Sequence, residues 1–163
     1  MTMTRTGIGY DVHSFAEGRR LVLGGVEIPS DRGLMGHSDA DVLLHAIADA
    51  ILGALGEPDI GFYFPPNDPS IEGISSLEIL RKCADLVKER GGRLVNVDST
   101  LIAEGPKIMK FAPQMKERIA EVLGVKPNRI GIKATTNERM GFVGREEGMA
   151  AMAVASVEVP EED

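Results

Sequence analysis

This chain of 163 residues is poor in cysteine and in aromatic side chains. Cys83 is its only cysteine, so no disulfide can form within one copy, and the reducing cytoplasm is the expected compartment. Tryptophan is absent and aromatic residues make up only 4%, so we expect an aliphatic core that includes Cys83. No apolar run approaches the length of a membrane span, and residues 1–6 show no targeting signal, so no membrane partner is expected.

Positive charge is also in short supply. The 18 Lys and Arg residues are outnumbered by 25 Asp and Glu residues, which gives a formal net charge of −7. Proteins that bind the phosphate backbone of nucleic acids carry an excess of cationic side chains, so no nucleic-acid partner is expected. A small anionic ligand would need a metal ion or a few well-placed cations. The length favours a single domain over residues 1–163.

Hydrophobic periodicity and turn residues predict interleaved strands and helices in the order ββααβαββ. The predicted strands cover residues 6–13, 21–28, 93–103, 129–136 and 149–159, and the predicted helices cover residues 38–56, 75–90 and 113–124. We expect the first two strands to form a hairpin and residues 61–73, rich in Pro and Gly, to form a mobile surface loop. The order indicates an α+β fold in which helices cover one face of a mixed β-sheet. Self-association would cover the other face.

Two of the three histidines lie in acidic surroundings. Asp11 and His13 are two positions apart in a predicted strand, so their side chains project from the same face. With His45 they offer one carboxylate and two imidazoles and leave a fourth position open, a ligand set that suits a catalytic zinc-type ion. From spacing alone the alternatives stay open: a carboxylate and a half-exposed histidine at a strand end, and a hydrogen-bonded core histidine in a helix.

The helix predicted over residues 38–56 carries His45 on a polar face. Ser38 is the expected N-cap, with Asp41 as its capping-box partner. Asp41 and Asp49 lie on the same side of the helix as His45, so either carboxylate is a candidate to orient the second imidazole nitrogen. The opposite side is apolar and is expected to face the core.

Two predicted strand ends carry groups that suit a phosphate. Lys107 follows Gly-Pro after one strand, and Thr135 and Thr136 lie at the end of another, so hydroxyl groups, backbone N–H groups and cations are available there. Glu138 beside such donors suits Mg²⁺ or Mn²⁺ bound to phosphate oxygens. Ordinary turns and a surface glutamate are the alternative interpretations.

Several longer segments have an uncommon composition. They are Ser38-Asp-Ala-Asp-Val-Leu-Leu-His-Ala-Ile-Ala-Asp-Ala-Ile-Leu-Gly53, Gly9-Tyr-Asp-Val-His13, Gly-His37-Ser38, Asp59-Ile-Gly61, Asn96-Val-Asp98, Pro106-Lys107, Lys133-Ala-Thr-Thr136 and Glu138-Arg-Met-Gly-Phe142-Val-Gly-Arg145. In order and approximate spacing they resemble the 2-C-methyl-D-erythritol 2,4-cyclodiphosphate synthase family of the non-mevalonate isoprenoid pathway. The resemblance covers nearly the whole chain.

The resemblance implies a homotrimer with sheets packed around a threefold axis and three active sites between neighbouring subunits. It implies that Asp11, His13 and His45 bind a zinc-type divalent cation and that Glu138 helps to bind Mg²⁺ or Mn²⁺. The resemblance implies substrate contacts for Asp11 and His13, for His37 and Ser38 at the methylerythritol phosphate, and for a substrate-side loop with Asp59, Ile60, Gly61, Phe64 and Asp68. Around cytidine diphosphate it implies contacts from Ala103, Lys107, Ile108, Met109, Thr135 and Thr136. It also implies contacts from Ala134, Asn137, Glu138 and Arg139, and places Phe142 and Arg145 near the central channel.

The activity implied by the resemblance is that of a phosphorus–oxygen lyase. The family's substrate is 4-diphosphocytidyl-2-C-methyl-D-erythritol 2-phosphate, whose 2-phosphate attacks the β-phosphorus, closes a cyclic diphosphate and expels CMP. Both reacting groups are anionic, so cations must offset their repulsion. We expect the zinc-type ion to polarise the β-phosphate and the second cation to bridge the α- and β-phosphates. His37 and Thr136 are the implied catalytic residues, which stabilise the pentacoordinate arrangement by hydrogen bonds.

Four positions depart from the family's usual pattern: Pro66, Glu104, Gly105 and Arg139. None is a predicted metal ligand, so we expect them to change substrate affinity more than the type of reaction. Two other functions use the same residues. One is a metal-dependent phosphoesterase, in which water attacks the diphosphate. The other is a non-catalytic trimer that binds cytidine nucleotides or isoprenoid diphosphates.

Overall fold

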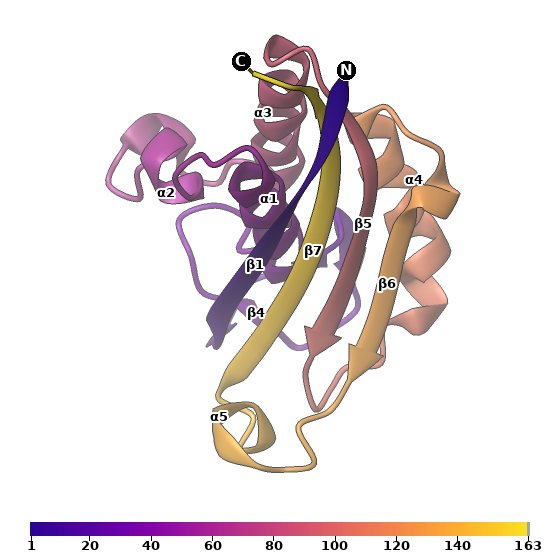
Figure 1. The fold of residues 1–163 in the computed structure, drawn as a ribbon. Coiled ribbons are helices and arrows are strands. Elements are labelled where there is room, and N and C mark those ends of the chain that lie inside the picture. The colour runs from indigo at the N-terminus through magenta and orange to yellow at the C-terminus, as the bar shows by residue number, and fades with distance from the viewer. Residues whose placement is uncertain (163) are drawn as a thin grey trace.

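The computed structural model describes residues 1–162 and has a five-stranded sheet at its centre (Figure 1). The strand order is β4-β1-β7-β5-β6, and only β5 and β6 run parallel to each other. The strands are β1 (Thr2–Glu17), β4 (Arg32–Leu34), β5 (Arg93–Ile102), β6 (Ile130–Thr135) and β7 (Gly148–Pro160). The predicted α+β class with a mixed sheet is confirmed.

Three long helices lie on one face of this sheet, behind it in the view of Figure 1. They are α1 (Val42–Ala54), α3 (Ser76–Glu89) and α4 (Ala112–Leu123); α2 (Ile60–Tyr63) and α5 (Gly141–Gly144) are single turns, and 3₁₀ turns cover Pro69–Ile71, Met109–Phe111 and Pro127–Arg129. None of the described helices has both the length and the apolar character that a membrane crossing requires.

The region around the predicted second strand differs from expectation. Residues 21–28 form two short strands, β2 (Leu21–Leu23) and β3 (Val26–Ile28), which pair with each other around a turn at Gly24 and Gly25. The predicted hairpin with residues 6–13 is wrong because β1 pairs with β7 along almost its whole length. The predicted loop over residues 61–73 is partly helical, since it includes most of α2 and a 3₁₀ turn.

Helix α1 lies directly against the backbone of β1. A Cβ atom at Gly7 would lie 2.0 Å from the carbonyl oxygen of Ala50, and one at Gly9 would lie 1.9 Å from that of Ala46. Only glycine permits this approach, because any side chain would push the helix away from the strand. The contact brings the first turns of α1 beside the part of β1 that carries Asp11 and His13.

The start of α1 corrects two predictions. Asp41, rather than Ser38, is the N-cap, and its carboxylate accepts hydrogen bonds from the backbone N–H groups of Leu44, Gly24 and Gly25 at 3.0, 3.0 and 2.7 Å. The helix is buried on nearly all sides, so Asp41 does not lie on an open polar face. Burial, followed by the charge of Asp39, raises the pKa of Asp41 to about 7, against the three N–H groups that lower it.

The predicted limits of α3 and α4 hold more closely. The side chain of Ser75 caps α3 by accepting a hydrogen bond from the N–H of Leu77, while Glu78, its predicted capping-box partner, pairs with Arg81 instead. Helix α4 has its Pro in the first turn and ends at Gly124 in the left-handed conformation.

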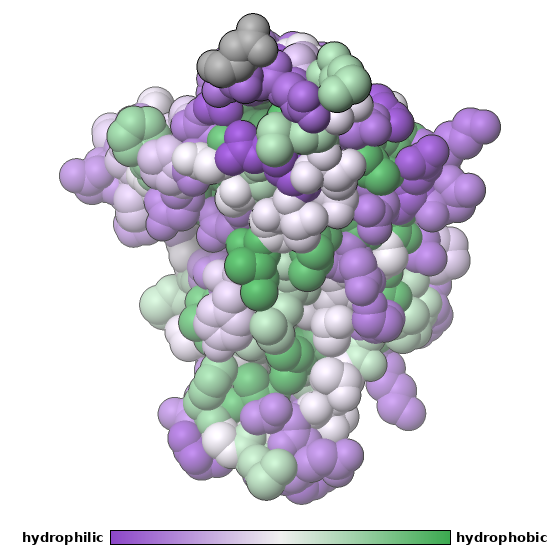
Figure 2. All heavy atoms as spheres, viewed as in Figure 1, coloured by the Kyte–Doolittle hydropathy of each residue, from purple (hydrophilic) through white to green (hydrophobic). Residues whose placement is uncertain are grey.

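The sheet face away from the helices is apolar along its centre. Ile8 is 67% exposed and Tyr10 is 52% exposed, and the facing residues of β7, Val154 and Met152, are also exposed. Figure 2 shows hydrophobic side chains running down the middle of this face, with hydrophilic side chains toward its edges. An exposed apolar patch of this kind is typical of an interaction surface.

The contact between α1 and β1 yields a direct test. We expect Gly9→Ala to lower the free energy of unfolding by about 3 kcal/mol, because the new methyl group overlaps a helix carbonyl group. Gly53→Ala, at which the nearest atom outside its helix is the Cα of Gly7 at 3.5 Å, is the matched control and should be tolerated. Urea unfolding compares the two variants, and equal stabilities would contradict the proposed packing.

Cys83 is buried in the core, as predicted. Burial, followed by the charge of Asp49, raises the pKa of its thiol from 9.0 to about 12. Between these two pH values the unfolded chain loses a proton that the folded chain keeps, so this group contributes less to stability as the pH rises. At about pH 8 a thiol-specific disulfide reagent should modify Cys83 rapidly only in urea. Rapid modification of the native protein would contradict this burial.

Candidate metal centre

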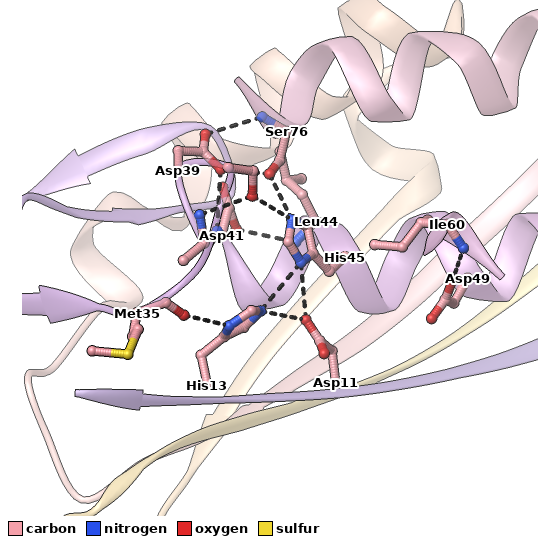
Figure 3. A network of polar contacts seen from close by, with 12 residues as sticks. Asp11, His13, Met35, Asp39, Asp41, Leu44, His45, Asp49, Ile60 and Ser76 are labelled. Carbon is pink, nitrogen blue, oxygen red and sulfur yellow. Dashed lines mark hydrogen bonds and ion pairs between the residues drawn. The ribbon is translucent and has the colours of Figure 1, made fainter. Parts of the chain in front are cut away.

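Three side chains converge where β1 passes the first turns of α1 (Figure 3). Asp11 Oδ2 lies 2.8 Å from His13 Nε2 and 3.0 Å from His45 Nδ1, and the two nitrogens are 3.2 Å apart. The side chains of Asp11 and His13 are 25% and 18% exposed, whereas that of His45 is 8% exposed. The three ligand atoms predicted from the sequence therefore share one small, partly accessible position.

The tautomer of His13 follows from its hydrogen bond to the backbone. Its Nδ1 lies 2.7 Å from the carbonyl oxygen of Met35, which can only accept a hydrogen bond. His13 Nδ1 therefore carries the proton in the neutral ring, and the lone pair of Nε2 points toward Asp11 and His45.

His45 is oriented by serines, not by Asp41 or Asp49 as predicted. Its Nε2 lies 2.9 Å from Ser76 Oγ and 3.1 Å from Ser38 Oγ. Ser76 Oγ donates its proton to Asp39, so it accepts one from His45 Nε2, and the lone pair of His45 Nδ1 faces Asp11 and His13. Asp41 instead holds the β2–β3 turn, and Asp49 accepts from the N–H of Ile60.

This arrangement of acceptors attracts a positive charge. Burial acts to raise the pKa of Asp11, but His13 and His45, when protonated, donate hydrogen bonds to it and carry positive charge, which together outweigh burial and hold that pKa well below its usual range. Burial acts to lower the pKa of His13, but its hydrogen bond with Asp11 and the charge of that carboxylate raise it overall. Three lone pairs that face one another repel unless a proton or a metal ion lies between them.

The donor set fits a zinc-type ion. Tetrahedral ligands about 2.0–2.2 Å from zinc lie roughly 3.3–3.6 Å apart. The three separations here, 2.8 to 3.2 Å, are slightly shorter, so a small outward movement of the side chains would admit the ion. One oxygen and two nitrogen ligands leave the fourth position for a ligand oxygen.

One predicted substrate-side segment, which includes Ser38, adjoins the three ligands, and a second follows α1. Ser38 is buried beside His45, and His37 is exposed, with its carbonyl oxygen accepting from the N–H of Gly73. The segment that includes Asp59, Ile60, Gly61, Phe64 and Asp68 follows α1 and is joined to it by the hydrogen bond between Ile60 and Asp49. Their predicted contacts with substrate remain predictions.

The other predicted residues form a separate region at the ends of β5 and β6. A cavity of about 250 Å³ is lined there by Leu101, Ala103, Glu104, Pro106, Lys107, Ile108, Met109, Ala134, Thr135 and Thr136. Asn137, Glu138 and Arg139 follow β6, and Phe142 and Arg145 belong to the turn of α5 and its C-cap. Thr136 Oγ1 accepts from the N–H of Glu138 at 3.2 Å.

Glu104 has a role that the sequence did not reveal. Its carboxylate accepts hydrogen bonds from the backbone N–H groups of Asn137 at 3.3 Å and Arg139 at 2.5 Å. Glu138 and Arg139 both have positive φ angles, 52° and 60°, so the loop needs such support. Glu104 therefore joins the loop after β5 to the loop after β6. Asp39, Ser76 and the Met35 carbonyl group were missed as well, because no local spacing links them to a histidine.

The candidate metal ligands and the cavity near Thr135 lie on different strands of the sheet, toward its opposite edges. Asp11 and His13 belong to β1, which has only the short β4 outside it, whereas the cavity with Thr135 and Thr136 belongs to β5 and to the edge strand β6. Strand β7 separates β1 from β5 (Figure 1). One copy of the chain thus carries the two predicted halves of the site apart from each other.

Fold and site together define an α+β protein with a candidate carboxylate–histidine metal site beside a mixed sheet. The sequence model of the YgbB family matches residues 4–158, and the chain belongs to this family. It is 63% identical over 158 residues, 96% of this chain and 94% of the relative, to the 2-C-methyl-D-erythritol 2,4-cyclodiphosphate synthase of Akkermansia muciniphila. It is also 63% identical over 151 residues, 93% of this chain and 96% of the relative, to the synthase of that name from Symbiobacterium thermophilum.

Solved structures agree with this assignment. The CDP complex of IspF from Plasmodium falciparum has a TM-score of 0.83 and 34% sequence identity to this chain, with 98% of this chain and 97% of the other covered. The fold seen here is therefore that of a solved protein bound to a cytidine nucleotide.

The assignment of His45 as a metal ligand can be tested by comparing it with His37, the histidine outside the group. We expect the wild-type chain to bind zinc at the three converging ligands and His45→Ala to lose this binding, because two ligands and an open site hold the ion weakly. Competition with a chromophoric chelator measures the bound zinc. His37→Ala removes the histidine outside the group and is the matched control. Loss of zinc from both variants alike, or from neither, would contradict the assignment.

Proposed function

We infer that this chain is a cyclodiphosphate synthase: it converts 4-diphosphocytidyl-2-C-methyl-D-erythritol 2-phosphate into 2-C-methyl-D-erythritol 2,4-cyclodiphosphate and CMP. The observation that carries this function is the convergence of Asp11, His13 and His45 on the fold of the YgbB family. The relatives named as this synthase are similar over nearly their whole length.

The reaction is an internal phosphoryl transfer. An oxygen of the 2-phosphate forms a bond to the β-phosphorus, and the bond from that phosphorus to the oxygen bridging it to the α-phosphate breaks. The electron pair leaves with CMP, so no residue of the chain needs to form a covalent intermediate. The task of the protein is to bend a flexible substrate into line and to offset the repulsion between its anionic groups.

We propose that Asp11, His13 and His45 hold a zinc-type cation against the diphosphate. When bound, this ion would supply Lewis acidity toward phosphate oxygens. The chain's contribution is the fixed orientation of both imidazole rings, which the Met35 carbonyl group and the Ser76 hydroxyl group provide. We propose Glu138 as a ligand of Mg²⁺ or Mn²⁺, supported by its position beside the hydroxyl group of Thr136.

The proposed substrate contacts divide between the two regions. We propose that His37 and Ser38 contact the methylerythritol phosphate and that residues 59–68 approach from α2. The cavity near Lys107 and Thr135 is the proposed cytidine diphosphate site; the solved Plasmodium falciparum relative is a CDP complex, which supports a ligand of this class. His37 and Thr136 are the proposed catalytic hydrogen-bond donors to the reacting phosphates, and Phe142 and Arg145 are proposed to face a channel between subunits.

We further propose a homotrimer. Each copy leaves an apolar sheet face uncovered, around Ile8 and Val154. Each also carries the metal ligands on β1 and the nucleotide cavity on β5 and β6, with β7 between these strands. Sheets packed around a threefold axis would cover the apolar faces and place the cavity of one copy next to the metal ligands of its neighbour.

Product analysis tests the reaction itself. Incubation of the purified protein, a divalent cation and the substrate should give CMP and the cyclic diphosphate in equal amounts, which phosphorus NMR distinguishes from open-chain phosphates. Open-chain products would indicate attack by water and would contradict the cyclisation. The absence of any turnover by metal-loaded protein would contradict an enzymatic role.

The shared site can be tested by mixing two inactive variants. His45→Ala damages the metal half, and Thr136→Ala combined with Glu138→Ala damages the nucleotide half. If neighbouring copies share each site, random mixed trimers should regain up to about one quarter of the wild-type sites. Native mass spectrometry checks that the copies exchange. Mixed trimers without activity would show that one copy supplies both halves.

A further inference from the structure

A second cavity lies away from both halves of the proposed active site. It has a volume of about 640 Å³ and is formed by the C-terminal ends of α3 and α4, the first residues of β5 and the segment between α4 and β6. The lining residues are Ile51, Ala84, Val87, Lys88, Gly92, Arg93, Leu94, Leu123, Gly124, Val125, Lys126, Asn128 and Arg129. None of them is a metal ligand or lines the cavity near Thr135.

The lining combines an apolar floor with charge of one sign. Val87, Leu94 and Leu123 are among its buried aliphatic residues. Four lining residues are cationic and none is acidic, although acidic residues outnumber basic ones 25 to 18 in the chain. A local positive charge on a protein with a net charge of −7 therefore surrounds an apolar hollow.

The four cationic side chains, Lys88, Arg93, Lys126 and Arg129, differ in whether they have a hydrogen-bonding or ion-pair partner. Arg93 pairs with Glu158, and Arg129 donates to the carbonyl oxygen of Val95 at 3.0 Å. Lys88 and Lys126 form no ion pair within residues 1–162. Lys88 lies in the last turn of α3, and Lys126 precedes a 3₁₀ turn after α4. Two ammonium groups at the cavity thus lack a carboxylate partner.

We propose that this cavity binds an amphipathic anion, in which a phosphate or carboxylate head group is joined to an aliphatic body. The head group lies between Lys88 and Lys126, with the guanidinium group of Arg129 able to add a hydrogen bond. The aliphatic body covers Val87, Leu94 and Val125 and displaces water from them. The volume falls in the range of small-ligand sites, about 300–1,000 Å³.

The test uses octyl phosphate as the probe and the methyl NMR signals of Val87, Leu94 and Val125 as reporters. The full-length protein carries Lys88→Gln together with Lys126→Gln, and Lys82→Gln together with Lys110→Gln removes the same charge outside the cavity as a control. We expect octyl phosphate to shift the three reporters and the cavity variant to bind at least about tenfold more weakly than the control, because ion pairs hold the head group. Urea unfolding of both variants shows whether the fold is kept.

Further probes separate the head group from the body. Octanoate tests the carboxylate head, inorganic phosphate tests the head alone, and octanol tests the body alone; the last two should bind more weakly than octyl phosphate. The proposal fails if octyl phosphate leaves the three reporters unshifted, if the cavity variant and the control bind it equally, or if inorganic phosphate or octanol alone binds as tightly. A variant that no longer folds is replaced by Lys126→Gln alone, for which a smaller weakening of about threefold is expected because one ion pair remains.

Discussion

The contact between α1 and β1 is the constraint on which the rest of the structure depends. Glycines at positions 7 and 9 let the helix lie against the strand backbone, where side chains would overlap the carbonyl groups of Ala50 and Ala46. His45 is the residue before Ala46, so the same contact sets its distance from Asp11 and His13. A helix held farther away by even one methyl group would separate the ligands, since the three atoms lie within 3.2 Å of one another.

Position alone does not make a metal ligand, because each imidazole ring must also present a lone pair. A backbone carbonyl group sets the tautomer of His13, and a serine linked to Asp39 sets that of His45. Met35 directly follows β4, and Ser76 is the first residue of α3. Residues distant in sequence from the histidines therefore fix the tautomers of both imidazole rings. The cavity near Thr135, the proposed nucleotide site, is organised in the same way, because Glu104 accepts hydrogen bonds from the loop after β6. Assembly of several copies is the proposed route by which these two organised halves meet.

The sequence predicted the ligands better than their surroundings. Alternation in a strand is enough to place Asp11 and His13 on one face, and the long segment around His45 resembles a known family closely. The hydrogen-bond partners of the histidines could not be predicted from the sequence. Helical spacing suggested Asp41 and Asp49 as partners of His45, but tertiary packing places Ser76 there. Asp41 instead accepts hydrogen bonds from Gly24 and Gly25. The pairing of β1 with β7 was also unpredictable from local pattern, because the two strands lie at opposite ends of the chain. The three long helices, by contrast, are local and were predicted with small errors at their ends.

The central claim is that the three converging side chains bind one divalent cation that faces the substrate's diphosphate. Anomalous scattering at the zinc edge, from crystals grown with zinc and CDP, measures this most directly. The account predicts a peak about 2.0–2.2 Å from Asp11 Oδ2, His13 Nε2 and His45 Nδ1, with the fourth position directed toward the bound nucleotide's phosphate. A peak bound elsewhere, with these three side chains still in mutual hydrogen bonds, would contradict it.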